Sequence, residues 1–216
     1  MRIVWDESGK RIYETGVDRG VLYPRAPEAG YENGVAWNGL ITVSENPTGA
    51  EPTPMYADNI KYLNLMSVEE FEASIEAYTY PKEFEVCDGS AELAPGVNIG
   101  QQDRTTFGLC YRTMLGNDVE GTNYGYKLHL IYGALASPTE KSYETINDTP
   151  DAIAFSWDVT TTPMPVTGHK PTASLTVDST LVDNDKMAEL EAILYGDTDE
   201  PRLPTPDEVL EIITKI

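Results

Sequence analysis

Residues 68–80 read VEEFEASIEAYTY, a run in which apolar and acidic side chains alternate. A period of two residues is typical of a β-strand that has one apolar face and one polar face. The stretch therefore predicts a strand with an acidic surface on one side. The apolar side holds Phe71, Ala73, Ile75 and Ala77, and the other side holds Glu70, Glu72, Ser74 and Glu76.

A helix is the alternative for this stretch, because Ser67 and Glu70 form a capping-box pattern and an apolar helical face follows it. The continuation Tyr78-Thr79-Tyr80 is rich in residues that suit a pleated, half-buried surface. Pro81 then disfavours a helical conformation at Tyr80. We favour the strand.

The rest of the chain predicts a mainly β fold. Its 17 Gly and 15 Pro separate short runs, as in proteins built from many strands and turns. With 216 residues, of which 40% are hydrophobic, the chain can form one core. Six or more strands predict a sandwich or a barrel. Strands are expected at 34–43, 59–66, 105–114, 125–135, 142–146, 152–162 and 173–178, the first two paired as a hairpin.

A long Pro-rich loop separates the two strands of that hairpin. Connections of this length in a compact domain are usually functional or disordered. We expect the loop to reach outward, and a surface loop without a partner is the alternative. It consists of Ser44, Glu45, Asn46, Pro47, Thr48, Gly49, Ala50, Glu51, Pro52, Thr53 and Pro54.

Helices are expected mainly near the C-terminus. Pro81 to Cys87 predicts one short helix that Gly89 can close. Asp183 favours the start of a second helix, and Gly196 its end. Thr205-Pro206-Asp207-Glu208 combines a cap, a first-turn proline and a capping-box glutamate, so a third helix begins there. We expect a β domain with an N-terminal arm over 1–182 and a helical extension over 183–216 that is not an independent domain.

Composition and charge exclude several classes of function. A formal charge of −21 argues against sequence-independent nucleic-acid binding, which needs Lys and Arg to displace counterions. Cys87 and Cys110, the only cysteines, provide neither a disulfide framework nor a four-ligand zinc site. No stretch approaches the roughly 20 apolar residues of a membrane span, and the N-terminus has no signal-peptide core. The chain is therefore expected to be made in the cytoplasm and to have no membrane partner.

Catalytic motifs are weak. His129 and His169 are the only histidines, and nucleophilic catalysis needs a base beside the nucleophile. His129 shares the polar face of its strand with Lys127, where a solvated or hydrogen-bonded histidine is the simpler interpretation. Cys110 has no adjacent histidine to activate it. Glu70, Glu72 and Glu76 could suggest glycosidase carboxylates, but three like charges on one strand are more simply a solvated or channel-lining face. We expect no enzyme activity, metal or cofactor.

Several segments carry a resemblance to a known family. They are 37–40 (WNGL), 56–63 (YADNIKYL), 76–81 (EAYTYP), 125–137, 142–148 (SYETIND) and 154–157 (AFSW). In these stretches the chain resembles the major tail protein, or tail tube protein, of long-tailed phages of Gram-positive bacteria. The match covers nearly the whole chain, and its motifs are structural rather than catalytic.

The resemblance implies a tail-tube fold: a β-sandwich with a flanking helix, assembled into hexameric rings that stack into a tube. It implies a virion protein that assembles in the host cytoplasm and whose tube conducts DNA during ejection. Its partners would be other copies of itself and the tape-measure, tail terminator and distal tail proteins. The loop over 44–54 would contact the neighbouring ring, and the N- and C-terminal segments would help to join rings.

An acidic lining would suit such a channel, because carboxylates repel phosphates within about 8 Å at physiological salt. We therefore expect that Glu70, Glu72 and Glu76 include residues facing the lumen, and the alternative is that other strands line it. A different class of function stays open as well. A β-sandwich binding module on a virion, with carbohydrate or a host receptor as ligand, would show exposed aromatic side chains clustered at one end.

Overall fold

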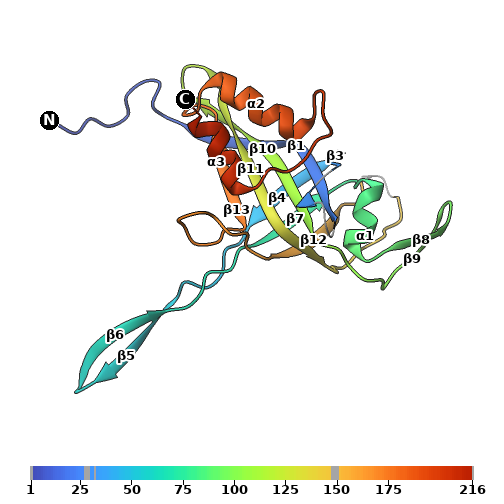
Figure 1. Ribbon diagram of the computed structural model, residues 1–216, viewed down its shortest axis with the longest axis horizontal. Helices are drawn as coiled ribbons and strands as arrows, with labels where there is room; N and C mark the ends of the chain where they lie inside the picture. Colours follow the sequence, from blue (N-terminus) through green and yellow to red (C-terminus); the bar gives the residue numbers. More distant parts are fainter. Residues whose placement is uncertain (1, 27–29, 32, 147–150, 216) are drawn as a thin grey trace.

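A computed structural model describes residues 2–26, 30–31, 33–146 and 151–215. The protein is mainly β, as the sequence predicts, with one large antiparallel sheet, two separate hairpins and a few short helices (Figure 1). Among the described residues, no helix is long and apolar enough to cross a membrane. The elements are β1 (Tyr13–Ala26), β2 (Gly30–Tyr31), β3 (Val35–Trp37), β4 (Leu40–Glu45), β5 (Pro52–Ala57), β6 (Ile60–Met66), β7 (Glu72–Ala77), η1 (Lys82–Phe84), α1 (Glu85–Asp88), β8 (Ala91–Ala94), β9 (Val97–Ile99), β10 (Phe107–Asn117), β11 (Gly121–Ser137), β12 (Phe155–Thr161), β13 (Ser174–Asp178), α2 (Asn184–Tyr195) and α3 (Pro206–Thr214).

The large sheet bends back on itself into a sandwich. Its strand order is β2-β1-β10-β11-β12-β7-β4, with β13 beside β11 and β3 beside β1. Buried side chains of β1 and β10 share one core with those of β7 and β12, so the two ends of the sheet face each other. Phe84, the last residue of η1, belongs to this core, and its ring packs edge-on against Trp157 and Phe107 at centroid distances of 5.0 and 5.4 Å.

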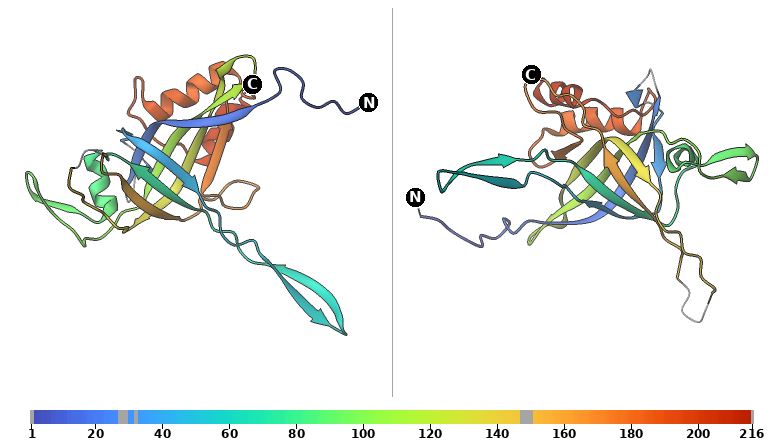
Figure 2. Two further views of the ribbon diagram at one scale, coloured as in Figure 1. Left: turned by 180° about the vertical axis from the view of Figure 1, so that it is seen from behind. Right: turned by 90° about the horizontal axis from the view of Figure 1, so that it is seen from below.

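The outer face of the β1-β10-β11-β13 layer is covered by the two C-terminal helices (Figures 1 and 2). Leu190 and Leu194 of α2 and Val209 of α3 pack there against Leu128 and other buried side chains of the sheet. The Tyr23 hydroxyl also donates a 2.6 Å hydrogen bond to the carbonyl of Leu194. The sandwich therefore has one outer face covered by helices.

The bend is concentrated in β11. On one edge, its residues 127–131 pair with β13 and its residues 134–137 pair with β12. Gly133 lies between the two segments with a φ of +60°, a conformation that residues with a Cβ rarely adopt. A Cβ at this position would also collide with the carbonyl oxygen of Thr162. Glycine therefore lets one 17-residue strand contribute to both layers.

Several predicted elements are confirmed and others are wrong. The predicted strand over 68–80 forms only over residues 72–77, as β7, and the helix after Pro81 forms as η1 and α1, closed by Gly89 at φ +75°. Asp183 caps α2, and α3 has the complete capping box. The strand predicted at 142–146 is wrong: these residues form no regular structure and are exposed, because they lie outside the sandwich and cover no apolar surface. Residues 147–148 of the family-like stretch lie outside the described part.

The hairpin predicted between 34–43 and 59–66 is also wrong. β4 pairs with β7, whereas β6 pairs with β5. The turn between β5 and β6 consists of Asp58 and Asn59, which both have positive φ values, of 51° and 61°. Two such residues form the tight turn whose twist suits a hairpin, and Asp and Asn tolerate it better than most side chains. The hairpin therefore closes within 52–66, and the supposed loop supplies one of its strands.

Candidate functional site

The sandwich has a second outer face, on the layer formed by β4, β7, β12 and the end of β11. Side chains that point away from the core are paired across these strands, for example Glu76 with Thr42 and Asp158 with Ser74. All of them are at least partly exposed. We call this surface the open face; it consists of Thr42, Ser44, Glu72, Ser74, Glu76, Leu135, Ser137, Ser156, Asp158 and Thr160.

The open face is acidic and rich in hydroxyl groups. Its charged residues are Glu72, Glu76 and Asp158, and none of its ten residues is basic. The three carboxylates form no ion pair with any other residue that the structure describes. The register of β7 is fixed by the residues that alternate with these on the strand. They point into the core and are buried: Ala73, Ile75 and Ala77. The surface therefore presents unpaired negative charge from a rigid sheet.

The structure brings together two of the three glutamates singled out in the sequence. Glu72 and Glu76 lie on the open face, four positions apart in β7 and on the same side as Ser74. Glu70 precedes the strand and forms a β-bridge with Thr48 in both directions, at N···O distances of 2.8 and 2.9 Å. Asp158 was not singled out, although it lies in a predicted strand; its place beside β7 depends on the long-range pairing of β12.

A projecting arm interrupts the chain between β4 and β7 (Figure 1). It consists of residues 46–71, and its two sides run antiparallel from the Thr48–Glu70 bridge to the β5–β6 hairpin. The segment over 44–54 therefore does reach outward, as expected, but as one side of a paired ribbon. Ser44 and Glu45 belong to β4, and Pro52, Thr53 and Pro54 belong to β5.

The hairpin of the arm stands away from the body in all three views (Figures 1 and 2). Every residue from 52 to 66 is exposed, including large apolar side chains. An isolated two-stranded hairpin is marginally stable in water, and exposed apolar groups of this extent mark interaction surfaces. The apolar side chains are Met55, Tyr56, Ile60, Tyr62, Leu63, Leu65 and Met66.

The N-terminal segment is a second exposed extension. Residues 2–12 have no regular structure and extend from the start of β1, toward the same side of the body as the arm (Figures 1 and 2). Trp5 is 74% exposed, and Ile3 and Val4 are similarly uncovered. The chain thus presents apolar side chains on this segment as well as on the arm.

A polar cluster joins the root of the arm to the body. Glu45, the last residue of β4, accepts a 2.6 Å hydrogen bond from the Tyr111 hydroxyl. The ring of His129 stacks on Tyr111 with 4.7 Å between centroids, and its Nδ1 lies 3.6 Å from Oε1 of Glu45. His129 and Tyr111 hold the pKa of the Glu45 carboxyl below its usual value. The cluster fixes the last residue before the arm.

The polar environment of His129 agrees with the interpretation of its strand pattern. Its Nε2 lies 2.9 Å from Thr113 Oγ1 and 3.4 Å from Glu14 Oε1. Lys127, on the same side of β11, donates to the other oxygen of Glu14 at 2.6 Å. Because the ring is held between strands by these polar contacts, they account for the histidine structurally.

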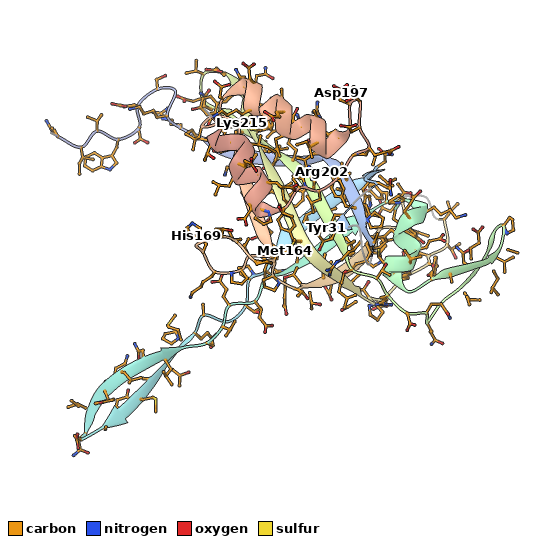
Figure 3. The ribbon with its side chains drawn as sticks, viewed as in Figure 1. Tyr31, Met164, His169, Asp197, Arg202 and Lys215 are labelled. Atoms are coloured by element: carbon orange, nitrogen blue, oxygen red, sulfur yellow. The ribbon has the colours of Figure 1, made fainter. Side chains whose placement is uncertain are left out.

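Figure 3 shows the side chains and places His169 in a loop of its own, away from the strands. This loop lies between β12 and β13, and His169 is exposed. Cys87 and Cys110 are free and buried, and burial raises the pKa of each thiol. Within the described ranges, no three His, Cys, Asp or Glu side chains are grouped as a metal site requires. The surfaces that stand out are therefore the open face, the arm and the N-terminal segment.

Comparison with known proteins adds no relative. No family model matches the chain, and a search of curated proteins found no match.

Proposed function

We propose that this protein is a structural subunit that polymerises with copies of itself into a tube, like the tail tube proteins that its sequence resembles. The observation that carries this proposal is the arm. A monomer gains nothing from a ribbon that exposes seven large apolar side chains to water, whereas an assembly can bury them. The exposed N-terminal segment supports the same conclusion.

In this proposal the open face lines the channel of the tube. A conduit for DNA has to avoid binding it, and a carboxylate lining without lysine or arginine repels phosphates over about one Debye length. Glu72, Glu76 and Asp158 would supply the charge. Glu70 would lie nearer the contact between rings, because it belongs to the root of the arm.

The arm would contact a subunit of the next ring, and the N-terminal segment would contribute to the same joint. Rings of six, ejection of DNA and attachment to tape-measure, terminator and distal tail proteins follow from the resemblance alone. Exposed aromatic side chains do not favour a carbohydrate- or receptor-binding module. They are spread over separate segments: Trp5, Tyr13, Tyr56, Tyr62, Tyr78 and Tyr143.

Electron microscopy of the purified protein with and without the arm tests the proposal. Ser67 donates its backbone N–H to the carbonyl of Glu51, so residues 52–66 can be replaced by Gly-Gly across ends that already lie together. We expect stacked rings or tubes from the intact chain. The shortened chain should keep its thermal unfolding midpoint but yield monomers or unstacked rings. Intact chains that stay monomeric at high concentration would contradict the proposal.

A further inference from the structure

The hydrogen bonds around His129 determine which of its ring nitrogens carries a hydrogen. Thr113 has one hydroxyl hydrogen, and it donates that hydrogen to Oε1 of Glu14 at 2.5 Å. The 2.9 Å contact between Thr113 Oγ1 and Nε2 of His129 therefore needs a hydrogen from the ring. Nε2 is a donor in this arrangement, whether the ring is neutral or charged.

The other ring nitrogen faces an oxygen that has no hydrogen to give. Nδ1 of His129 is buried, has no hydrogen-bond partner among the described residues, and lies 3.6 Å from Oε1 of Glu45. That oxygen accepts a 2.6 Å hydrogen bond from the Tyr111 hydroxyl. In a neutral ring, the lone pair of Nδ1 would face a carboxylate oxygen, which is a repulsive arrangement. A proton on Nδ1 turns the same approach into an attraction between an imidazolium and a carboxylate.

Both carboxylates beside the ring are ionised at neutral pH. Burial raises the pKa of Glu14, but hydrogen bonds from Lys127 and Thr113 outweigh this effect and lower the pKa below its ordinary value. The pKa of Glu45 is lowered as well, chiefly by the neighbouring imidazole. The cluster thus holds two negative charges and the positive charge of Lys127, so an imidazolium makes it neutral.

The other strands around the ring contribute uncharged groups. In β10 the ring stacks on Tyr111, whose pKa is raised by burial, and in β13 its neighbour in register is Thr176. β7 approaches through Ala73, which is paired with the last residue of β4. The charged groups around the ring come from three strands: Glu14 of β1, Glu45 of β4 and Lys127 of β11.

The two carboxylates lie where the N-terminal segment and the arm begin. Glu14 is the second residue of β1, directly after the N-terminal segment. Glu45 is the last residue of β4, directly before the arm. Because β1 and β4 belong to opposite layers of the sandwich, a charged ring between these carboxylates holds the layers together at the root of the arm.

We propose that His129 is a pH-sensitive switch: with its proton it holds Glu14 and Glu45 together, and without that proton it no longer attracts Glu45 and the root of the arm loosens. The proton passes from Nδ1 to water, and the hydrogen on Nε2 keeps its bond to Thr113. An unfolded histidine loses its proton at about pH 6.5. Because the folded chain holds the proton beside two carboxylates, the stabilisation is complete below that pH and is lost as the pH rises above it.

NMR of the imidazole nitrogens tests the position of the proton. At pH 5.5 we expect both ring nitrogens of His129 to carry a hydrogen, and at pH 9 only Nε2. His169 is the internal reference, because it is exposed in its loop and should exchange between both neutral tautomers. A His129 ring that is neutral at pH 5.5, that stays charged at pH 9, or that keeps its hydrogen on Nδ1 overturns the inference.

Hydrogen exchange at the root of the arm tests the consequence. The amides of Asn46 and Thr48 donate across this root, at N···O distances of 2.8 Å. In dilute wild-type chains, we expect their protection factors to fall about tenfold between pH 5.5 and pH 9, as loss of one charge-assisted hydrogen bond implies. In E45Q the protection should not depend on pH, because a neutral amide forms no ion pair with the ring. E51Q, the same change at an exposed carboxylate of the arm, is the matched control and should behave like the wild type.

Protection that does not depend on pH in the wild type, or that keeps its dependence in E45Q, overturns the inference. The switch belongs to the single chain, so either result leaves the proposed assembly standing. Conversely, chains that never form tubes would contradict the proposed function and leave the switch intact.

Discussion

Ile75 and Glu76 are neighbours in β7 that point to opposite sides of the sandwich. Ile75 is 1% exposed in the core, and Glu76 lies on the open face. Truncating a buried isoleucine removes core contacts and leaves a cavity. We expect I75A to lower the free energy of unfolding by about 2–5 kcal/mol, measured by urea denaturation.

E76Q is the matched control, since it removes charge from the adjacent residue without changing its size. A surface substitution of this kind changes stability by no more than about 0.5 kcal/mol. Equal losses from I75A and E76Q would contradict the register of β7.

Asp18 makes the free energy of unfolding depend on pH. Arg112 donates to both oxygens of Asp18, at 2.7 and 2.6 Å, and this pairing lowers the pKa of the Asp18 carboxyl. A carboxyl whose pKa is lower in the folded state stabilises the fold above its unfolded pKa, of about 3.9. That contribution is lost as pH falls through the folded pKa.

Thermal unfolding between pH 6 and pH 2 tests this pair. D18N should be less stable than the wild type at pH 6, and the two proteins should converge as the pH falls toward 2. A difference that stays constant with pH would contradict the role of the charge.

At the scale of elements, the bend of β11 depends on Gly133. G133A would force a residue with a Cβ into the left-handed region and against the carbonyl of Thr162. Gly121, at the start of β11, has a φ of +61° but open space around it. G121A should therefore cost only about 1–2 kcal/mol of conformational strain.

We expect the loss of unfolding free energy in G133A to exceed that in G121A clearly, because the collision is added to the strain. Both can be measured by denaturant unfolding. Equal losses would mean that the bend of β11 does not depend on Gly133.

Elements whose signals are local were predictable from the sequence. The alternation in β7 and the capping box of α3 each lie within a few residues, and both form as predicted. The pairing of β4 was not predictable in the same way. Its partner β7 follows the whole arm, and the prolines of β5 read as a loop because proline is rare inside sheets. The Asp58-Asn59 turn was the local signal that could have located the hairpin.

The open face was predictable only where its residues share one strand. Glu72 and Glu76 share a face because of their spacing within one strand. Asp158 joins them through the pairing of β12 with β7, which brings together residues more than 80 positions apart. The exposure of the apolar side chains of the arm is a property of the folded chain, since the sequence shows these side chains but not what covers them.

At the scale of the whole molecule, the distribution of charge gives a prediction about DNA. E72K/E76K/D158K reverses the charge of the open face, and D197K/D199K/E200K makes the same change of +6 on the exposed segment after α2. In assembled tubes, the first variant should bind DNA and slow its passage, because lysines replace the repelling carboxylates. The second variant should conduct DNA like the wild type. Identical behaviour of the two variants would place the open face outside the channel.

The most direct test of the account is a cryo-electron microscopy reconstruction of the assembled protein. We expect a tube in which the strands β4, β7 and β12 turn Glu72, Glu76 and Asp158 toward the central channel. The arm of each subunit should lie against a neighbouring copy. A tube whose channel is lined by α2 and α3, or arms that remain in solvent, would contradict the account.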